Sequence, residues 1–384
     1  MSAGALFWTG LSWWSATMVV QWLSAGLARL QRPPAAVRHR AADFSLVCPM
    51  VGRRDATEAY VRALERLAGA GAEILICVTT EDDEAVGAVR ALWPEAPILV
   101  GSDTTFNPKL NNVRKGFEAA SRPVVMLCDA GIAVTEADLA GAAALLSDKV
   151  GLVLALKVGT APGNFAAAME CSYINGHQAR FLLAADRLGM PVASGGVTIL
   201  DRDVLQRVGG HLGFLNYLAD DYSIVRTVRD NVGLTTWLAN VTPAMPVGRR
   251  TWRDVWRRQV RWGSTRLNLS PEVRALVLFE PVIGWLVSGL ALATALVAAG
   301  TAGPWIVAAL LGHSVAWLAA EEWFLARYRL PGGPRAWAAA LARELLVPWL
   351  AFEAWRGRNR IDWRGTDLAA GWRPDGDSPA GKRV

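Results

Sequence analysis

The stretch Val124-Val125-Met126-Leu127-Cys128-Asp129-Ala130-Gly131 decides the fold that we expect for this chain. Five apolar residues in a row end at one carboxylate, which is followed by two small residues. Such an uninterrupted apolar run is typical of a strand that is buried on both faces of a parallel sheet. Ligands of parallel sheets lie beyond the carboxyl ends of the strands, so we expect Asp129 at a ligand-binding edge.

Apolar runs and helical spacing alternate on either side of this stretch. The predicted strands cover residues 44–49, 73–78, 98–100 and 150–158, and the predicted helices cover residues 55–70, 83–92, 109–120, 165–185 and 220–230. This alternation predicts an α/β fold with a mostly parallel sheet and helices on both faces. Residues 194–200 predict a loop that enters a further strand.

Several apolar segments predict contact with a membrane. Residues 3–28 carry no charged side chain and are long enough to span a bilayer, although a buried helix of a soluble protein is an alternative. Basic residues follow this segment, which by the positive-inside rule places the rest of the chain in the cytoplasm. Residues 275–299 and 303–320 predict a transmembrane hairpin. Residues 336–355 contain ionisable side chains and predict a re-entrant or interfacial segment.

These segments predict the domain organisation of the 384 residues. We expect an N-terminal transmembrane anchor (1–30), a cytosolic catalytic domain (31–250), an amphipathic interfacial helix (251–270), a C-terminal membrane region (271–372) and a disordered tail (373–384). The net charge of +6 suits nucleic acid, anionic lipid or phosphate-bearing substrates, and the apolar segments favour the last two. The four cysteines lack the spacing of a zinc site.

Two charged motifs suggest chemistry. Asp220 and Asp221 are adjacent in Tyr217-Leu218-Ala219-Asp220-Asp221-Tyr222, and Arg258 and Arg261 follow in Arg257-Arg258-Gln259-Val260-Arg261-Trp262. Neighbouring carboxylates resist joint ionisation, which raises one pKa and suits a general base. Guanidinium groups bind diphosphate oxygens in a fork geometry. The alternatives are a helix N-cap for the aspartates and binding of anionic lipid for the arginines.

Other polar residues are weaker candidates. Asp129 can hold a divalent cation against a diphosphate, or it can be a turn aspartate. Asp82 or Asp83, after the second predicted strand, can contact a nucleoside, or both can belong to a solvated acidic run. In Asn107-Pro108-Lys109-Leu110-Asn111-Asn112 the lysine can neutralise a phosphate and the two later asparagines can contact ribose or uracil, or the stretch can simply start a helix. His177 and Arg180 share one face of a predicted helix, where a surface histidine is the alternative.

Taken in order, these residues resemble the ceramide glucosyltransferase family, and the resemblance covers about residues 43–365. Its pieces are Asn107-Pro108-Lys109-x-Asn111-Asn112, Cys128-Asp129-x-Gly131-Ile132, Phe165-Ala166-Ala167 with Glu170 and Tyr173, Tyr217-x-Ala219-x-Asp221-Tyr222, Arg258-x-x-Arg261-Trp262, Glu280-Pro281, Arg343-Glu344 and Trp363-Arg364-Gly365.

The resemblance implies a membrane-bound inverting glycosyltransferase with a nucleotide-diphospho-sugar (GT-A) fold. It implies that Asp221 is the catalytic base, that Asp129 lies near a divalent metal ion, Mg or Mn, and that His177 lies near the acceptor. The expected substrate-binding residues are Asp83, Lys109, Asn111, Asn112, His177, Asp220, Arg258, Arg261 and Trp262. Gly131 stands where many relatives of the wider superfamily have a second metal-binding aspartate, which puts the metal in question.

The resemblance also suggests partners and a location. The donor is expected to be a UDP-sugar, with glucose as the sugar, and the acceptor the primary hydroxyl of ceramide or a similar membrane lipid. Transfer of N-acetylglucosamine or another sugar to a hopanoid polyol is an alternative, and a lipid-binding scaffold with an inactive transferase domain is a second. We expect no nucleic-acid partner. The Ala- and Arg-rich composition suggests a bacterial chain, so the expected location is a bacterial inner membrane. The positive-inside rule places the catalytic domain on its cytoplasmic side.

Overall fold

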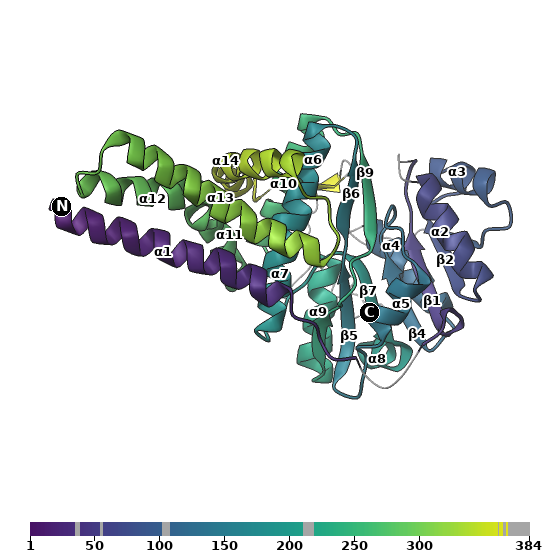
Figure 1. The fold of residues 1–384 in the computed structure, drawn as a ribbon. Helices are drawn as coiled ribbons and strands as arrows, with labels where there is room; N and C mark the ends of the chain where they lie inside the picture. Colours follow the sequence, from purple (N-terminus) through teal and green to yellow (C-terminus); the bar gives the residue numbers. More distant parts are fainter. Residues whose placement is uncertain are drawn as a thin grey trace. The chain divides into compact units, whose positions relative to one another are not determined.

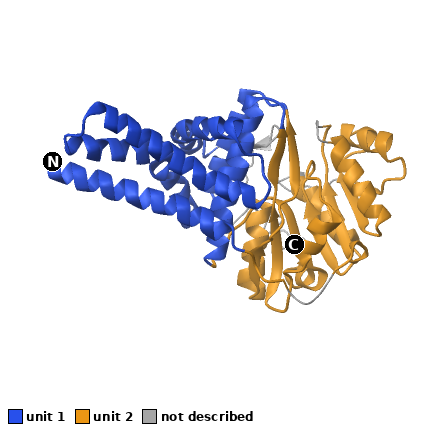
Figure 2. Cartoon of the chain, viewed as in Figure 1, with its two compact units in different colours: residues 1–30, 162–188, 249–361 blue, residues 31–161, 189–248, 362–384 orange. Residues whose placement is uncertain are grey.

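The computed structural model describes residues 1–34, 39–53, 57–101, 108–209, 219–359, 361–363 and 366–367. The chain forms two compact units, shown in different colours in Figure 2. Unit 1 comprises Met1–Leu30, Pro162–Leu188 and Arg249–Ile361, and unit 2 comprises Gln31–Ala161, Gly189–Gly248 and Asp362–Val384. This division differs from the expected continuous domain over 31–250, because the segment Pro162–Leu188 packs within unit 1. The expected disordered tail lies outside the described residues.

Unit 2 is built on a seven-stranded sheet in the described part of the chain, with the order β3-β2-β1-β4-β7-β5-β8 (Figure 1). Its strands are β1 (Phe44–Pro49), β2 (Glu73–Val78), β3 (Ile98–Val100), β4 (Val124–Cys128), β5 (Val150–Leu156), β7 (Gly196–Asp201) and β8 (Thr235–Leu238). All adjacent pairs are parallel except the two pairs that β7 makes, with β4 and with β5. The predicted mostly parallel α/β sheet is therefore confirmed.

The sheet forms because its strands are apolar along their whole length. Every residue of β1, β4 and β5 is buried, so these strands are covered on both faces. The helices of unit 2 are α2 (Thr57–Gly69), α3 (Glu84–Leu92), α4 (Pro108–Ala119), α5 (Glu136–Ala143), α8 (Arg202–Arg207) and α9 (Asp220–Val232). Short strands β6 (Val158–Pro162) and β9 (Ala244–Gly248) form a separate two-stranded sheet, as do β10 (Asp362–Trp363) and β11 (Thr366–Asp367).

Unit 1 is helical. Its helices are α1 (Ala3–Ala28), α6 (Phe165–Ser172), α7 (Arg180–Arg187), α10 (Trp252–Leu267), α11 (Pro271–Ile283), α12 (Trp285–Ala298), α13 (Gly303–Arg327) and α14 (Pro334–Arg356). The predicted helix over 165–185 contains a π-helical turn, Tyr173–Ala179, between α6 and α7. The predicted segment 275–299 is two helices that meet at a 48° bend. Pro281 lacks a backbone N–H and Gly284 has extended backbone, which together end α11.

The long helices of unit 1 bury polar side chains and expose apolar ones. In Figure 1, α1 runs beside α12 and α13. The Thr17 hydroxyl lies 2.6 Å from that of Ser288 on α12, and Gln21 donates to the carbonyl of Trp317 on α13 at 3.1 Å. The large apolar residues of α1 instead face outward, and Val19 is 61% exposed. This pattern is the reverse of that in a water-soluble bundle, where polar side chains face outward.

Within the described residues, α13 is long and apolar enough to cross a membrane, and α11 and α12 pass the same test together as a bent pair. Helix α1 spans 26 residues and is not among the helices that pass this test. The predicted N-terminal anchor therefore stays a prediction.

Candidate active site

One edge of the unit 2 sheet gathers the charged residues. Asp129 follows the end of β4, and Lys157 follows the end of β5, which runs in the same direction as β4. Gly195 directly precedes β7, which runs the opposite way and so begins at that edge. These residues are brought together by strand direction alone, as expected at the carboxyl ends of a parallel sheet.

Lys109 links two carboxylates at this edge. It lies in the first turn of α4, and its ammonium is 2.7 Å from Asp129 Oδ1 and 2.7 Å from Asp220 Oδ2. The Lys157 ammonium lies 4.0 Å from the other oxygen of Asp129. Burial alone would lower the pKa of Lys109, but the carboxylates of Asp129 and Asp220 outweigh it and raise the pKa, so the side chain stays charged.

Asp221 lies in the first turn of α9, next to Asp220. Burial raises the pKa of Asp221 to about 6, and the charge of Asp220 adds to the effect. The backbone N–H of Tyr222 donates to Asp221 Oδ1 at 2.9 Å, which opposes the rise and fixes the carboxylate. A Cβ on Gly195 would lie 3.5 Å from Asp221 Oδ2 and 3.9 Å from Asp129 Oδ2, so Gly195 borders the space between these two carboxylates. Asp221 is therefore a carboxylate that is charged at neutral pH and still basic.

The other predicted residues of unit 2 lie in more structural positions. Asp83 is the N-cap of α3, where its Oδ1 accepts from the N–H groups of Ala85 and Gly52, each at 2.8 Å. Asn111 and Asn112 are 7% and 4% exposed, and Asn112 donates to the carbonyl of Met50 at 3.4 Å. The proposed contacts of these residues with a nucleotide stay predictions. Tyr217 and Leu218 of the aspartate motif lie outside the described residues.

In unit 1, Arg258 is held by a fully buried carboxylate. Glu170 on α6 lies 2.5 Å from Arg258 Nη1 and 3.3 Å from Arg250 Nε. Arg261 and Trp262 follow on α10 and are half-buried. The arginine motif and the carboxylate motif thus belong to different units, and in unit 1 the first arginine of the motif is bound to a protein partner.

The π-helical turn of unit 1 carries His177 to another ion pair. His177 Nε2 lies 3.8 Å from Glu280 Oε1, and Glu280 Oε2 accepts from Arg266 at 3.3 Å. The guanidinium of Arg180 donates to Gln21 on α1. Arg180 and His177, which were expected on one helix face, therefore contact different partners. His177, Arg266 and Glu280 line a cavity of about 30 Å³ together with Gln259. The cavity has room for one or two water molecules.

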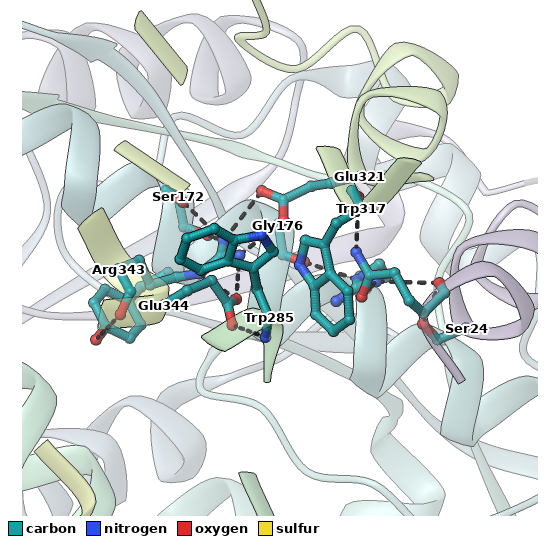
Figure 3. A network of polar contacts seen from close by, with 11 residues as sticks. Ser24, Ser172, Gly176, Trp285, Trp317, Glu321, Arg343 and Glu344 are labelled. Carbon is teal, nitrogen blue, oxygen red and sulfur yellow. Dashed lines mark hydrogen bonds and ion pairs between the residues drawn. The ribbon is translucent and has the colours of Figure 1, made fainter. Parts of the chain in front are cut away.

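A third charged cluster is fully buried in unit 1 (Figure 3). Arg343 on α14 lies 2.8 Å from Glu321 on α13 and 2.7 Å from Glu344, and it donates to the carbonyl of Ser172 at 2.8 Å. Glu344 accepts from the backbone N–H of Trp285 at the start of α12. A side chain on Gly176 would overlap the carboxylate of Glu321, so the π-helical turn approaches the cluster only because it has a glycine there.

Comparison with known proteins identifies the group to which this chain belongs. The profile of glycosyl transferase family 21 matches residues 11–375, which is nearly the whole chain. The chain belongs to glycosyl transferase family 21. It is therefore a glycosyltransferase, and the predicted resemblance to ceramide glucosyltransferases is confirmed.

Two curated relatives of this family 21 chain come from Caenorhabditis elegans. Ceramide glucosyltransferase 3 is 25% identical over 340 residues, which cover 85% of this chain and 72% of that protein. Ceramide glucosyltransferase 1 is 27% identical over 229 residues, which cover 58% of this chain and 48% of that protein. Among solved structures, a mannosyltransferase from Pyrobaculum calidifontis in complex with GDP-Man and Mn²⁺ matches with a TM-score of 0.52 at 18% identity. The match covers 90% of this chain and 99% of the mannosyltransferase chain, and it supports the GT-A fold.

Some residues of these sites escaped the sequence analysis. Lys157 directly follows a buried strand, as Asp129 does. The rule that ligands lie beyond the carboxyl ends of the strands could therefore have identified Lys157 as well. Glu170 and Glu280 appeared only as motif residues, because their charge partners are distant in sequence. A glutamate inside an otherwise apolar helix, as in Phe165–Ser172, is the signal that points to a buried ion pair.

Proposed function

We propose that this family 21 enzyme is an inverting transferase that moves glucose from UDP-glucose to the primary hydroxyl of ceramide or a similar membrane lipid. The observation that carries the proposal is the group of Asp221, Asp220, Asp129 and two lysines at one sheet edge. The names of the two nematode relatives, both ceramide glucosyltransferases, support glucose as the sugar and ceramide as the acceptor.

The residues of this edge divide the chemistry. Asp221 takes the proton of the lipid hydroxyl as the oxygen attacks the anomeric carbon, and a single displacement of this kind inverts the stereochemistry there. Lys109 and Lys157 supply positive charge for the leaving diphosphate. Gly195 borders the space between Asp221 and Asp129 in which the reacting atoms can lie. Arg258, Arg261 and Trp262 are proposed to contact the diphosphate, and His177 the acceptor.

A divalent cation, Mg or Mn, fits this edge through Asp129. The Asp129 side chain is 27% exposed, and a positively charged group, the ammonium of Lys109, already lies against it. No three His, Cys, Asp or Glu side chains form a metal site among the residues that the structure describes. That agrees with a cation held by one or two carboxylates and the substrate phosphates. Such an ion would neutralise charge on the departing diphosphate.

We propose that unit 1 lies in or on a bilayer, in a bacterial inner membrane with the catalytic unit on the cytoplasmic side. Helices α1, α12 and α13 expose their apolar residues and pair their polar ones. A lipid acceptor is insoluble in water, so an enzyme that uses it benefits from a membrane-embedded part. Added protease should cleave unit 2 in inverted inner-membrane vesicles, which present the cytoplasmic face outward, and should leave it intact in right-side-out vesicles. Cleavage of unit 2 in sealed right-side-out vesicles but not in inverted ones would overturn this orientation.

The direct test is a transfer assay. Purified full-length protein in detergent is incubated with UDP-glucose and ceramide, with a matched panel of UDP-N-acetylglucosamine and hopanoid polyol. We expect release of UDP and a β-linked glucosyl lipid from the first pair, measured by mass spectrometry and by NMR of the anomeric proton. An α-linked product would contradict the inverting mechanism. Turnover only with the second pair would replace the proposed donor and acceptor.

A further inference from the structure

The ion pair network at the sheet edge of unit 2 contains an internal cation. Lys109 Nζ is 2.7 Å from both Asp129 Oδ1 and Asp220 Oδ2, and the three side chains are 19%, 27% and 16% exposed. These distances are those of charge-assisted hydrogen bonds to two carboxylates at once. The lysine therefore occupies the position between carboxylates where a free cation is also most favourable.

The local charges make lysine and a divalent ion competitors. Three carboxylates, Asp129, Asp220 and Asp221, face two ammonium groups, Lys109 and Lys157, so one negative charge is uncompensated. A divalent ion on Asp129 would come next to the Lys109 ammonium, and the two positive charges repel. The lysine is tethered to α4 and loses no translational freedom when it binds, whereas a free ion does. Without another anion the lysine therefore keeps the carboxylates.

A nucleoside diphosphate changes this balance. Its phosphate oxygens offer the ammonium anionic partners as good as the two carboxylates, and they also ligate a divalent ion. If Lys109 turns to the phosphates, Asp129 becomes available to the metal. The side chains are exposed enough for this exchange without opening the core of unit 2.

We propose that Lys109 is an internal cation that excludes a divalent metal from Asp129 until a nucleoside diphosphate binds and takes over the ammonium. Metal and donor then load together, and the empty enzyme does not retain metal. The inference rests on the proposed function only in taking a nucleoside diphosphate as the ligand of this edge. It concerns the order of binding, and neither the sugar nor the lipid enters it.

The test is a Mn²⁺ titration of the full-length protein in detergent, with free Mn²⁺ measured by electron paramagnetic resonance, with and without UDP. For the unmodified protein we expect UDP to tighten Mn²⁺ binding at least tenfold. In Lys109→Met, Mn²⁺ should bind without UDP at least tenfold more tightly than it binds the unmodified protein, and UDP should tighten Mn²⁺ binding by a smaller factor than in the unmodified protein. Lys109→Arg, which keeps the charge, should keep the dependence on UDP.

Two matched variants distinguish the effect of the lysine bridge between Asp129 and Asp220 from the effect of removing any positive charge. Lys157→Met removes a charge beside Asp129 without removing the bridge, and Arg114→Met removes an exposed charge from the same helix as Lys109. In both variants, Mn²⁺ without UDP should bind less than tenfold more tightly than it binds the unmodified protein. Arg114→Met should also keep the UDP dependence, whereas Lys157→Met, which removes a proposed phosphate contact, should weaken UDP binding itself. The inference would be overturned if Mn²⁺ binding without UDP tightened equally in Lys109→Met and Lys157→Met. Tight Mn²⁺ binding to the unmodified protein without UDP would also overturn it, and that measurement does not depend on the folding of any variant.

Failure of the proposed function gives a different result. If UDP and Mn²⁺ bind in the expected order but UDP-glucose and ceramide yield no glycolipid, the loading mechanism stands and the assigned substrates fall. If glycolipid forms but Mn²⁺ binds tightly without UDP, the substrates stand and the internal cation is wrong.

Discussion

Two clusters of charge, one in each unit, use the same residue types in opposite ways. In unit 2, Lys109 bridges two aspartates, and the side chains are between 16% and 27% exposed. In unit 1, Arg343 bridges two glutamates, and none of these side chains is more than 5% exposed. The first cluster can exchange partners with a ligand from water, whereas the second is sealed among helices. Exposure, more than charge, separates a chemical site from a structural one.

The largest effect is expected at the base. Asp221→Asn removes the proton acceptor but keeps the shape of the side chain, so the rate of glycosyl transfer should fall by about 10²–10⁴-fold. UDP binding, measured by calorimetry, should change little, because the neutral amide still fits the edge. The control is Asp230→Asn, an exposed aspartate in the same helix that pairs with Arg226. A transfer rate within a few-fold of the unmodified enzyme would remove Asp221 from the mechanism.

The sealed cluster should instead respond in stability. Arg343→Met leaves Glu321 and Glu344 buried without their cation, which should lower the free energy of unfolding by about 3–5 kcal/mol. The control is Arg356→Met at the exposed end of the same helix, where the pair with Glu353 contributes less than about 1 kcal/mol. Thermal unfolding in detergent compares the two. If Arg343→Met unfolds like the control, the buried cluster is not structural.

Glu170 lies between these two extremes, since it is fully buried while its arginine partners are 21% and 28% exposed. Glu170→Gln should lower the free energy of unfolding by about 1–3 kcal/mol, less than Arg343→Met, because water can solvate the released arginines. A double-mutant cycle with Arg258→Gln measures the pair itself. Additive effects of the two substitutions would show that the 2.5 Å contact between them carries no coupling energy.

The exposed cluster should also respond to pH. Since burial and the neighbouring charge raise the pKa of Asp221 to about 6, the base is protonated below that pH and deprotonated above it. The transfer kcat/KM should therefore be flat above about pH 7 and fall about tenfold for each unit below pH 6. A kcat/KM profile in detergent from pH 4.5 to 8 measures it. A profile that stays flat down to pH 4.5 would mean that no group with this pKa acts as the base.

The sequence predicted the parts of this molecule that depend on local pattern. The bounds of β1, β2, β3 and β4 match the predicted runs, because a strand buried on both faces must be apolar throughout. The edge position of Asp129 followed from strand direction in the same way. Other features depend on partners far along the chain. Arg258 and its carboxylate Glu170 are 88 positions apart, so the motif alone could not show that the arginine is already paired.

Two further features escaped the sequence analysis for the same reason. The close approach of the π-helical turn to Glu321 depends on Gly176, and the grouping of Pro162–Leu188 with unit 1 depends on packing. Helix α1 shows a related limit, because its sequence alone does not show that Thr17, Gln21 and Ser24 are buried within the structure. A mean hydropathy contains no information on the direction in which each side chain points.

The smallest effect on stability is expected at the buried polar face of α1. This substitution also tests most directly whether lipid or water surrounds the helix. Thr17→Val removes the 2.6 Å hydrogen bond to Ser288, and polar pairs between membrane helices contribute about 0.6 kcal/mol on average. The matched control is Thr9→Val on the exposed face of the same helix, which should be neutral or slightly favourable in a lipid environment. Thermal unfolding in nanodiscs and in mild detergent compares the two. A larger loss of stability in Thr9→Val than in Thr17→Val would mean that water, rather than lipid, surrounds α1. The contrast between a membrane unit and a soluble unit would then not hold for α1.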